Sequence, residues 1–564
     1  MPIRSLVFGI SLLLLLELAG CVGTRVNSPQ ISVKVSGSGT GTITSMPNGI
    51  SCPNKCSVPF DAGTSITLTE VPGGASAFSG WSGACSGTGT TCTLTLNGDE
   101  TVTAEFHKAN ITAINHIIIM AQENRSFDSY FGALRQYWKQ NGYSGQAFDG
   151  LPQFGGGPVP ANPGCDPAFA FPGSDCMIDS ASPAIASYHF QTMCVENPSP
   201  SWNESHVDFN LHNAVSGTAT LDGFVHTAAH DARNQTPPFN DVNGVRAMGY
   251  YTGDDLNYYY FMASNFATSD RWFSPAMSRT QVNRMYLLAA TSHGHAYSLD
   301  FSHSQQLNVP IIFQVLQQHG ISWKIYVHPG PGGCASPSCL FQLSYINQFT
   351  YGNTILAQYP QNLAPVSQFL TDAKNGKLPQ VALIEPASNV ALDEHPADSD
   401  TGPPPNVQSG AQYVSSLITG LMNSPSWQDS AFIFTFDEFG GFYDHVPPQP
   451  TVSPDGIPPS DLAPGDICTL STGPTCNFTY TGYRVPLIVI SPFAKKHYVS
   501  HTVADYTAML KFIEKRFKLP SLTKRDAAQM DMTEFFDFVQ EPWAKPPNPP
   551  AQNTGGACYL DHLP

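Results

Sequence analysis

A short apolar run that leads directly into two acidic residues constrains this fold more than any other stretch. Residues 431–436 (AFIFTF) are too short for a typical helix and lack polar alternation, which predicts a buried parallel strand. Asp437 and Glu438 follow at once, and Gly440 and Gly441 then let the backbone turn closely. Open α/β sheets bind their ligands at the carboxyl ends of strands. We therefore predict a functional site where this strand ends.

A second apolar run, residues 116–120 (HIIIM), has the same design and leads into Glu123 and Asn124. If both strands belong to one parallel sheet, Asp437 and Glu438 lie at the same edge as this second pair. Oxygen ligands gathered in this way suit a divalent cation. A solvated turn is the alternative for the first pair, and a helix cap is the alternative for the second. We favour metal binding, because a solvated turn poorly explains two acids between a buried strand and two glycines.

Strands that alternate with helices extend over residues 111–540. Apolar runs at 321–327, 381–384 and 485–490 predict further buried strands, and Asn308 to Gly320 predicts a helix. This alternation indicates an α/β sheet with helices on both faces.

The two ends of the chain have different compositions. Residues 31–107 show short alternating runs broken by Gly, Pro and Asn, which predicts a small all-β domain with antiparallel strands. Its turn FSGWSGAC and closing run VTAEF resemble the β-grasp-like repeat modules of bacterial surface proteins. We favour a spacer role over partner binding for this domain. Residues 541–564 form a Pro-rich tail.

The amino terminus predicts export. Arg4 precedes an apolar run, and LAGC at residues 18–21 resembles a bacterial lipoprotein signal in which Cys21 becomes the lipidated amino terminus. An ordinary secretory signal cut nearby is the alternative. We expect residues 1–20 to be the signal and residues 21–30 a tether, so the mature protein is held at a bacterial membrane, at the cell surface or in the periplasm.

Thirteen cysteines agree with export. With Cys21 taken by lipid, an even number remains for disulfides in an oxidising compartment. Five pairs are close in sequence, which leaves Cys194 and Cys558 for a long-range bridge. Zinc binding is the weaker alternative for Cys52 and Cys56, because no histidine is adjacent. The local pairs are Cys52/Cys56, Cys85/Cys92, Cys165/Cys176, Cys334/Cys339 and Cys468/Cys476.

The composition narrows the class of partner and predicts long loops. The formal charge of −17, from 26 Lys and Arg against 43 Asp and Glu, argues against a nucleic-acid partner held through phosphate contacts. Glycine (47) and proline (48) are plentiful, so long loops are expected. We predict that residues 145–200 are an insertion on the side of the site.

Four longer motifs carry a family resemblance. HIIIMAQENRSFDSYFG, TFDEFGGFYDHVPP, GYRVPLIVISPFAK and HTVADYTAMLKFIEKRF resemble bacterial phosphoesterases, a family that includes phospholipases C and related acid phosphatases. The resemblance covers most of residues 113–538. It implies an alkaline-phosphatase-like α/β fold, a hydroxyl nucleophile, and a divalent metal held by Glu123, Asn124, Asp437 and Glu438.

The same resemblance points to a nucleophile. SRTQVNRMYLLAAT matches the nucleophile segment with Thr280, although Ser278 and Arg279 replace Gly-Pro. Thr280 precedes a predicted helix whose N–H groups favour a phosphoryl group, and coordination to the metal would lower the pKa of its hydroxyl. A helix N-cap is the alternative role for Thr280, and Ser278 is the rival nucleophile.

Histidines are the candidates for proton transfer. SWNESHVDFN followed by TLDGF points to His206, and LDEHP points to His395. Either side chain can protonate the leaving oxygen or hydrogen-bond the phosphoryl group. We expect Asp128 and Asp444 to orient ligands, whereas His445 is either a ligand or a core residue.

These observations predict an exported, lipid-anchored phosphoric ester hydrolase that forms a phosphothreonine. Cleavage of phosphodiesters in phospholipids by a phospholipase C is our first expectation. An acid phosphatase acting on phosphomonoesters is the alternative, because both activities share the motifs, and a catalytically inactive surface-binding lipoprotein is the third reading. Five tyrosines either shape a choline pocket or, as we favour, pack: Tyr250, Tyr251, Tyr258, Tyr259 and Tyr260.

Overall fold

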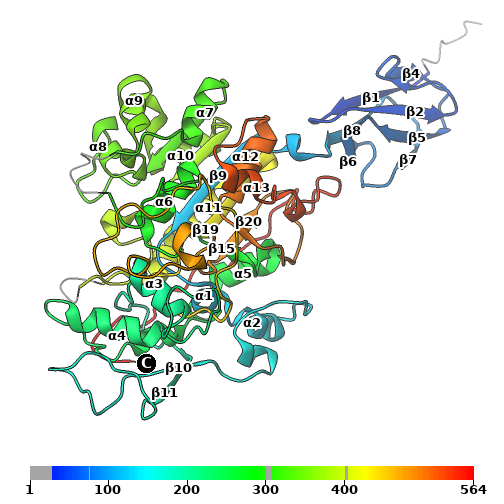
Figure 1. Ribbon diagram of the computed structural model, residues 1–564. Coiled ribbons are helices and arrows are strands. Elements are labelled where there is room, and N and C mark those ends of the chain that lie inside the picture. Colours follow the sequence, from blue (N-terminus) through cyan, green and yellow to red (C-terminus); the bar gives the residue numbers. More distant parts are fainter. Residues whose placement is uncertain (1–27, 75, 300–305, 400–403, 564) are drawn as a thin grey trace, which may run out of the picture. The chain divides into compact units, whose positions relative to one another are not determined.

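The structure is a computed structural model that describes residues 28–74, 76–299, 306–399 and 404–563. The chain divides into two compact units, Met1–His107 and Lys108–Pro564 (Figure 1). The predicted signal and the lipidated Cys21 lie outside the described residues. Among the helices in the described ranges, none combines the length and the hydropathy that a membrane span requires.

The N-terminal unit consists of two four-stranded sheets around one small core. The first has the order β4 (Ser57–Pro59), β1 (Gln30–Ser36), β8 (Glu100–Lys108) and β6 (Ser76–Gly83), and the second has the order β3 (Ser51–Cys52), β2 (Gly41–Met46), β5 (Thr64–Pro72) and β7 (Thr91–Leu96). The all-β prediction is confirmed, but not every pair is antiparallel. Strand β1 pairs with β8 in parallel, because the first and last strands of the module are neighbours in the sheet.

An eight-stranded sheet organises the second unit. Its order is β17 (Leu363–Pro365), β16 (Trp323–Val327), β18 (Val381–Ile384), β9 (His116–Gln122), β19 (Ser430–Phe436), β20 (Leu487–Ile490), β14 (Ala267–Ser269) and β21 (Tyr498–Ser500). The first five strands are parallel, and β20 runs antiparallel to both of its neighbours. The predicted strands are therefore present, in a mixed sheet.

The two strands that carry the predicted ligands are direct neighbours. Strand β9 pairs with β19 in parallel, from His116 opposite Ser430 to Gln122 opposite Phe436. Both strands are almost wholly buried, as their continuous apolar runs predict. Because the last paired residues face each other, the two loops that follow begin side by side at one edge of the sheet.

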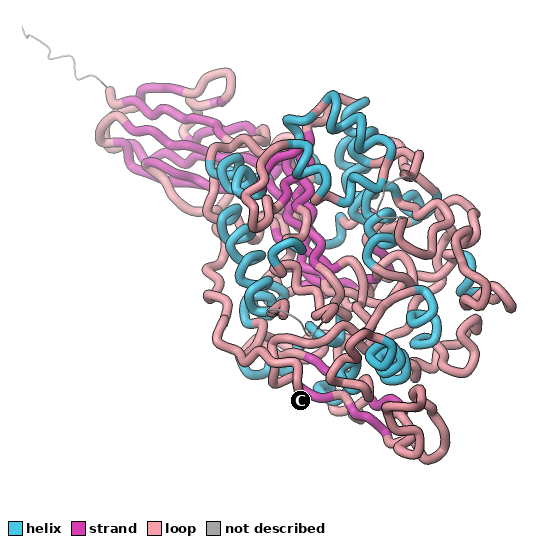
Figure 2. Tube along the Cα trace, turned by 90° about the vertical axis from the view of Figure 1, so that its left-hand side faces the viewer, coloured by secondary structure: helices cyan, strands magenta, loops and turns pink. Residues whose placement is uncertain are grey.

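Helices cover both faces of this sheet (Figures 1 and 2). On one face, α5 (Asn257–Asn265) stacks an aromatic ring on Phe434 of β19, α10 (Val366–Lys374) makes an edge-to-face ring contact with Phe432, and α11 (Val407–Met422) packs against both helices. On the other face, Ile119 and Leu383 lie with side chains of α6 (Thr280–Ala289), α7 (Ile312–Gln318) and α12 (Ala508–Phe517). The predicted α/β sheet with helices on both faces is confirmed.

The remaining elements are short. Residues 145–200 carry only β10 (Ala161–Pro163), β11 (Ala184–Ala186), β12 (Tyr188–His189) and a 3₁₀ turn, as expected for a loop-rich insertion. The other helices are α1 (Phe127–Phe131), α2 (Leu134–Asn141), α3 (Trp202–Phe209), α4 (Phe224–Asn234), α8 (Pro337–Gln342), α9 (Thr350–Gln358) and α13 (Lys524–Ala528), and the other strands are β13 (Gly249–Tyr250), β15 (Trp272–Phe273) and β22 (Ala504–Asp505).

All six predicted disulfides are present. Cys194 pairs with Cys558 across 364 residues and ties the C-terminal tail to the second unit. Cys52 and Cys56 are bonded to each other, so the zinc alternative for this pair is wrong.

Candidate active site

The loops after β9 and β19 meet the first turn of α6. The Thr280 hydroxyl donates a hydrogen bond to Asn124 Oδ1 at 3.2 Å, and the Asn124 backbone N–H donates to Asp437 Oδ1 at 3.1 Å. Asn124 adopts the left-handed backbone conformation (φ 61°), which turns the chain sharply after β9. The structure thus brings Thr280, Asn124 and Asp437 together although they are distant in sequence.

Arg284 lies one turn along α6 from Thr280 and contacts the carboxylates of Asp437 and Glu123. Its Nε lies 3.3 Å from Asp437 Oδ2, and its Nη2 lies 3.4 Å from Glu123 Oε1. The Tyr345 hydroxyl also donates to Glu123 Oε1, at 2.7 Å, and the guanidinium lies over the Tyr345 ring at 4.7 Å. Arg284 and Tyr345 therefore hold these carboxylates in fixed positions beside Thr280.

Glu438 completes the cluster. Its Oε2 accepts the backbone N–H of Gly440 at 2.6 Å, whereas its Oε1 is buried and has no hydrogen-bond partner among the described residues. Gly440 is required here, because its φ is +71° and a Cβ atom would lie 2.3 Å from the Asn124 carbonyl oxygen. The glycine pair thus allows the two ligand loops to touch.

The cluster contains more carboxylates than positively charged side chains. Burial, and then the charge of Asp437, raises the pKa of Glu123 to about 7. Burial also raises the pKa of Asp437, and burial followed by the charge of Asp437 raises the pKa of Glu438 well above its ordinary value. Three buried carboxylates, an amide oxygen and a hydroxyl are hard oxygen donors, and Arg284 is the one cation hydrogen-bonded to them in the described structure. The chemistry of this donor set, with the unpartnered Glu438 Oε1, suits a divalent cation, although among the described residues only Asp128, Asp444 and His445 bring three such ligand atoms within 4.8 Å of one another.

The segment before α6 distinguishes Thr280 from its rival. The Ser278 hydroxyl is buried and donates to the Ala296 carbonyl oxygen at 2.6 Å, so it does not face the carboxylates. Asn283 fixes this turn by donating to the Ser278 carbonyl oxygen at 2.7 Å and accepting from the Ala276 N–H at 3.0 Å. Arg279 occupies the N-cap position without a side-chain cap, and Thr280 is the first helical residue. The N-cap alternative for Thr280 is therefore wrong.

A pocket of about 380 Å³ opens over Thr280 and Glu123, whereas Asn124, Asp437 and Glu438 do not line it. Thr280, Glu123 and the predicted His395 line it. Arg279, Ser388 and Asp393 were not identified as site residues from the sequence, although Arg279 directly precedes Thr280 and replaces a proline of the family motif. Its side chain is exposed beside the pocket, and its charge partly offsets the rise that burial causes in the pKa of Glu438, so it can also contact an anion bound there.

His395 has the electrostatic surroundings of a proton donor. Burial lowers its pKa, but Asp398, Glu123 and Asp393 outweigh this effect, so that the pKa is raised above its ordinary value. The ring Nδ1 lies 2.6 Å from the Pro396 carbonyl oxygen, which orients the imidazole with Nδ1–H as the donor. The structure therefore places His395, but not His206, in the pocket with Thr280.

His206 is in the protein interior, which corrects our prediction of a role in proton transfer. Its side chain is fully buried, and the two ring nitrogens lie 2.7 Å from the Trp202 carbonyl oxygen and 3.3 Å from the Thr475 carbonyl oxygen. Burial lowers its pKa to about 4, so the ring is neutral at physiological pH. It does not line the pocket over Thr280. Its ring lies between α3 and the loop that contains Thr475.

Asp128, Asp444 and His445 form a separate cluster. They lie close enough together to hold a metal ion. However, Arg484 Nη2 lies 3.0 Å from Asp128 and Arg484 Nε lies 2.8 Å from Asp444, and His445 Nδ1 lies 2.6 Å from Asp128. These bonds already balance the carboxylate charges. We therefore interpret this cluster as a structural clamp rather than as groups that orient the ligand carboxylates.

The tyrosines that could have formed a choline pocket mainly pack in the core. The side chains of Tyr251, Tyr258, Tyr259 and Tyr260 are almost completely buried. The Tyr259 hydroxyl donates to the buried carboxylate of Glu394 at 2.5 Å. The packing interpretation is confirmed for these four residues.

Comparison with known proteins identifies both parts of the chain. Residues 114–520 match the model of the Phosphoesterase family, and residues 31–110 match that of the Divergent InlB B-repeat domain. The chain is 31% identical over 481 residues to "Phospholipase C B" of Mycobacterium tuberculosis, covering 80% of this chain and 81% of that protein. It is 28% identical to "Non-specific phospholipase C5" of Arabidopsis thaliana, with 73% and 72% covered, and 28% identical to "Non-hemolytic phospholipase C" of Burkholderia pseudomallei, with 78% and 61% covered.

Proposed function

Because the chain belongs to the phosphoesterase family and is a phosphoric ester hydrolase, we propose that it is a phospholipase C that cleaves phosphodiesters through a phosphothreonine at Thr280. The observation that carries this proposal is the Thr280 hydroxyl, which lies 3.2 Å from Asn124 Oδ1 at the floor of an open pocket. The names of the relatives support a phospholipid substrate.

The first half of the reaction transfers the phosphoryl group to the protein. Thr280 Oγ1 attacks phosphorus, and its proton, which is donated to Asn124 Oδ1 at rest, passes to Asp437, whose carboxylate is held on the Asn124 backbone and whose pKa burial raises. The bond from phosphorus to the alcohol oxygen breaks, and the alcohol takes a proton from His395. The free N–H groups at the start of α6 and the Arg279 guanidinium face the negative charge of the phosphoryl oxygens.

The second half returns the protein to its starting state. A water molecule attacks phosphorus, and His395, now neutral, accepts its proton. The bond from phosphorus to Thr280 Oγ1 breaks, and the oxygen recovers its proton from Asp437. The phosphorylated head group leaves, and all proton positions are restored.

The oxygen ligands Glu123, Asn124, Asp437 and Glu438, together with Thr280, would hold a divalent cation. When bound, this cation supplies charge that offsets the phosphoryl oxygens and favours the ionised form of the Thr280 hydroxyl. Arg284 would keep the carboxylates of Glu123 and Asp437 in place whether or not the cation is present.

The six disulfides fit an exported protein. We further propose that Cys21 carries a lipid anchor and that residues 31–107 separate the hydrolase from the membrane. Such an anchor would keep the hydrolase close to phospholipid substrates.

Activity measurements on two chromogenic esters test the proposal. We expect turnover of a 4-nitrophenyl phosphorylcholine diester that a chelator abolishes and that Thr280→Val reduces by at least about 10⁴-fold. Ser278→Ala is the matched control and should stay within about tenfold of the wild type, since it removes a hydroxyl that bonds only to a backbone carbonyl. Loss of activity in Ser278→Ala but not in Thr280→Val would contradict the assignment.

The same assay separates the alternatives. Faster turnover of a 4-nitrophenyl phosphomonoester would favour an acid phosphatase, an alternative that the exposed Arg279 beside the nucleophile supports, because a terminal phosphate carries additional charge. No turnover of either ester would favour a catalytically inactive surface-binding protein.

A further inference from the structure

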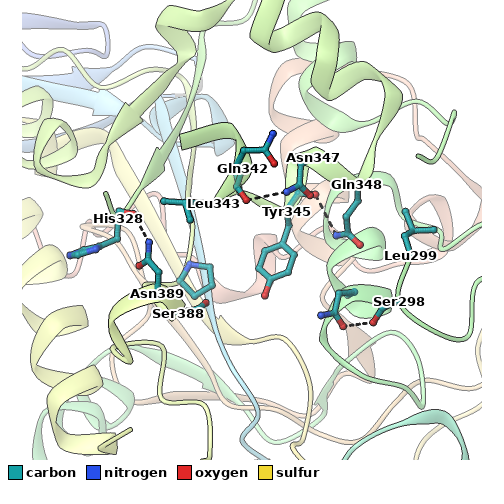
Figure 3. A pocket seen from close by; sticks show the side chains of 13 residues that line it. Ser298, Leu299, His328, Gln342, Leu343, Tyr345, Asn347, Gln348, Ser388 and Asn389 are labelled. Carbon is teal, nitrogen blue, oxygen red and sulfur yellow. Dashed lines mark hydrogen bonds between the residues drawn. The ribbon is translucent and has the colours of Figure 1, made fainter. Parts of the chain in front are cut away.

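A second pocket of about 330 Å³ adjoins the one over Thr280 (Figure 3). The two share Gln281, Tyr345 and Ser388 as walls. Gln281 directly follows Thr280, and Tyr345 is hydrogen-bonded to Glu123. A group attached to a phosphorus atom at Thr280 can therefore extend into this second pocket, which we call the side pocket.

The described residues that line the side pocket carry no formal charge. No Asp, Glu, Lys or Arg belongs to it among the residues that the structure describes. Burial lowers the pKa of His328, so its ring is neutral near pH 7. Among these described walls a cationic head group would find no carboxylate, and one face of the Tyr345 ring is already covered by Arg284. The side pocket therefore does not suit an ammonium group.

The polar groups that line the side pocket are side-chain amides, and they lie beside apolar side chains. The amide nitrogen of Gln348 donates a hydrogen bond to the Tyr345 carbonyl oxygen at 3.3 Å. The Oε1 atom of Gln348 is buried and has no partner in the described parts of the chain. Gln281 uses its Oε1 to accept from Ser298 at 2.7 Å, which leaves the amide nitrogen as a donor. Leu343 and the Tyr345 ring supply the apolar surface (Figure 3).

This combination matches one kind of ligand. A hydroxyl group both donates and accepts, so it can accept from the Gln281 amide nitrogen and, once the buried Gln348 side chain turns toward it, donate to Gln348 Oε1, whereas an ester carbonyl only accepts and a quaternary ammonium does neither. C–H faces of the same group can pack on Leu343 and Tyr345. The volume lies at the low end for ligand sites, enough for a small group but not for two long acyl chains.

We propose that the side pocket binds an uncharged, hydroxyl-bearing substituent of the phosphate ester, so that the protein prefers esters of polyols to esters of choline. The proposal rests on the proposed function, because it assigns the substituent that extends from phosphorus at Thr280. A lipid polyol head group and a free polyol phosphate share this chemistry, and the test distinguishes them.

The first experiment compares kcat/KM for three diesters in identical mixed micelles. Phosphatidylglycerol and phosphatidylpropanol have the same charge and the same number of head-group carbons, and they differ in the two hydroxyls. We expect phosphatidylglycerol to exceed both phosphatidylpropanol and phosphatidylcholine by at least about tenfold. Equal rates for the glycerol and propanol lipids would overturn the proposal.

A filled side pocket should remove this preference. Leu343→Trp should lower the ratio of kcat/KM for phosphatidylglycerol to that for phosphatidylpropanol from at least about tenfold to about one, and the remaining turnover of phosphatidylpropanol shows that the variant is folded. Leu370→Trp is the matched control, because both leucines are 36% exposed and Leu370 lies on α10 away from both pockets. Equal losses on both lipids, or the same effect in Leu370→Trp, would contradict a site in the side pocket.

Monoesters keep the test independent of diester activity. If only monoesters are hydrolysed, the phospholipase proposal fails, and glycerol 1-phosphate against propyl phosphate tests the side pocket and identifies a free polyol phosphate as the source. If neither diesters nor monoesters are hydrolysed, dissociation constants measured by calorimetry for glycerol 1-phosphate and propyl phosphate test the preference of the side pocket instead. Tighter binding of the glycerol ester, lost in Leu343→Trp, supports the proposal, and equal binding overturns it.

Discussion

Replacing Glu438 by glutamine should have opposite effects on the metal-free and the metal-bound protein. Without a cation, Glu438 is a buried acid whose pKa burial and Asp437 raise well above its ordinary value. Glutamine keeps an oxygen for the Gly440 N–H and carries no charge. The variant should therefore be at least as stable as the wild type without metal, and it should bind the cation much more weakly.

The size of the effect follows from proton linkage. A carboxyl group whose pKa is raised on folding holds its proton in the folded state above pH 4.5, where the unfolded chain releases it. The folded state then binds more protons than the unfolded state, so stability falls as pH rises, by up to about 1.4 kcal/mol per pH unit for one group. Glu438→Gln should remove that slope between about pH 5 and pH 7 in chelator.

Thermal unfolding with chelator and with added cation measures both effects. In the wild type, a cation at one hundred times its dissociation constant should stabilise the folded state by about 2.7 kcal/mol, and this gain should be largely absent in Glu438→Gln. Turnover should fall in parallel. A metal-free variant less stable than the wild type by more than about 2 kcal/mol, with its cation response intact, would refute the assignment of Glu438 as a ligand.

Two further predictions concern groups outside the pocket. Burial lowers the pKa of His445, but the charge of Asp128 outweighs burial and raises this pKa to about 10. The ion pair between His445 and Asp128 therefore stabilises the fold fully below about pH 6.5, and this stabilisation is lost as pH rises through 10. The melting temperature should fall over that window, and His445→Gln should flatten the fall; an unchanged profile would contradict the clamp. The Cys194–Cys558 bridge closes a long loop, so the double alanine variant should lose about 4 to 6 kcal/mol of stability in urea titrations, and a loss below about 1 kcal/mol would show that the tail is held by other contacts.

Regular patterns predicted the sheet that positions the site. The apolar runs before Glu123 and Asp437 predicted two buried strands, and the pairing of β9 with β19 places both ligand loops at one edge. The antiparallel direction of β20 was not predictable, because a buried run of four apolar residues looks the same in either direction. The cysteine pairs were predictable because five of them are local in sequence.

The walls of the pockets could not be predicted in the same way. Tyr345 and Ser388 begin short 3₁₀ turns, which are too short to show a periodic pattern in the sequence, and only the folded chain shows that both approach Glu123. His206 was assigned from a motif, but motif spacing does not say whether a ring faces the pocket or two backbone carbonyls. Arg279 carried a signal, since a charged residue replaces the proline directly before Thr280.

Trapping the covalent intermediate tests the central claim most directly. The protein is mixed with substrate, quenched in acid within one turnover and digested, and the peptide that contains Thr280 is weighed by mass spectrometry. We predict a mass increase equal to the transferred phosphoryl group on Thr280 and none in Thr280→Val. The same increase on Ser278 or His395, or a burst of released alcohol with no modified peptide, would contradict a phosphothreonine mechanism.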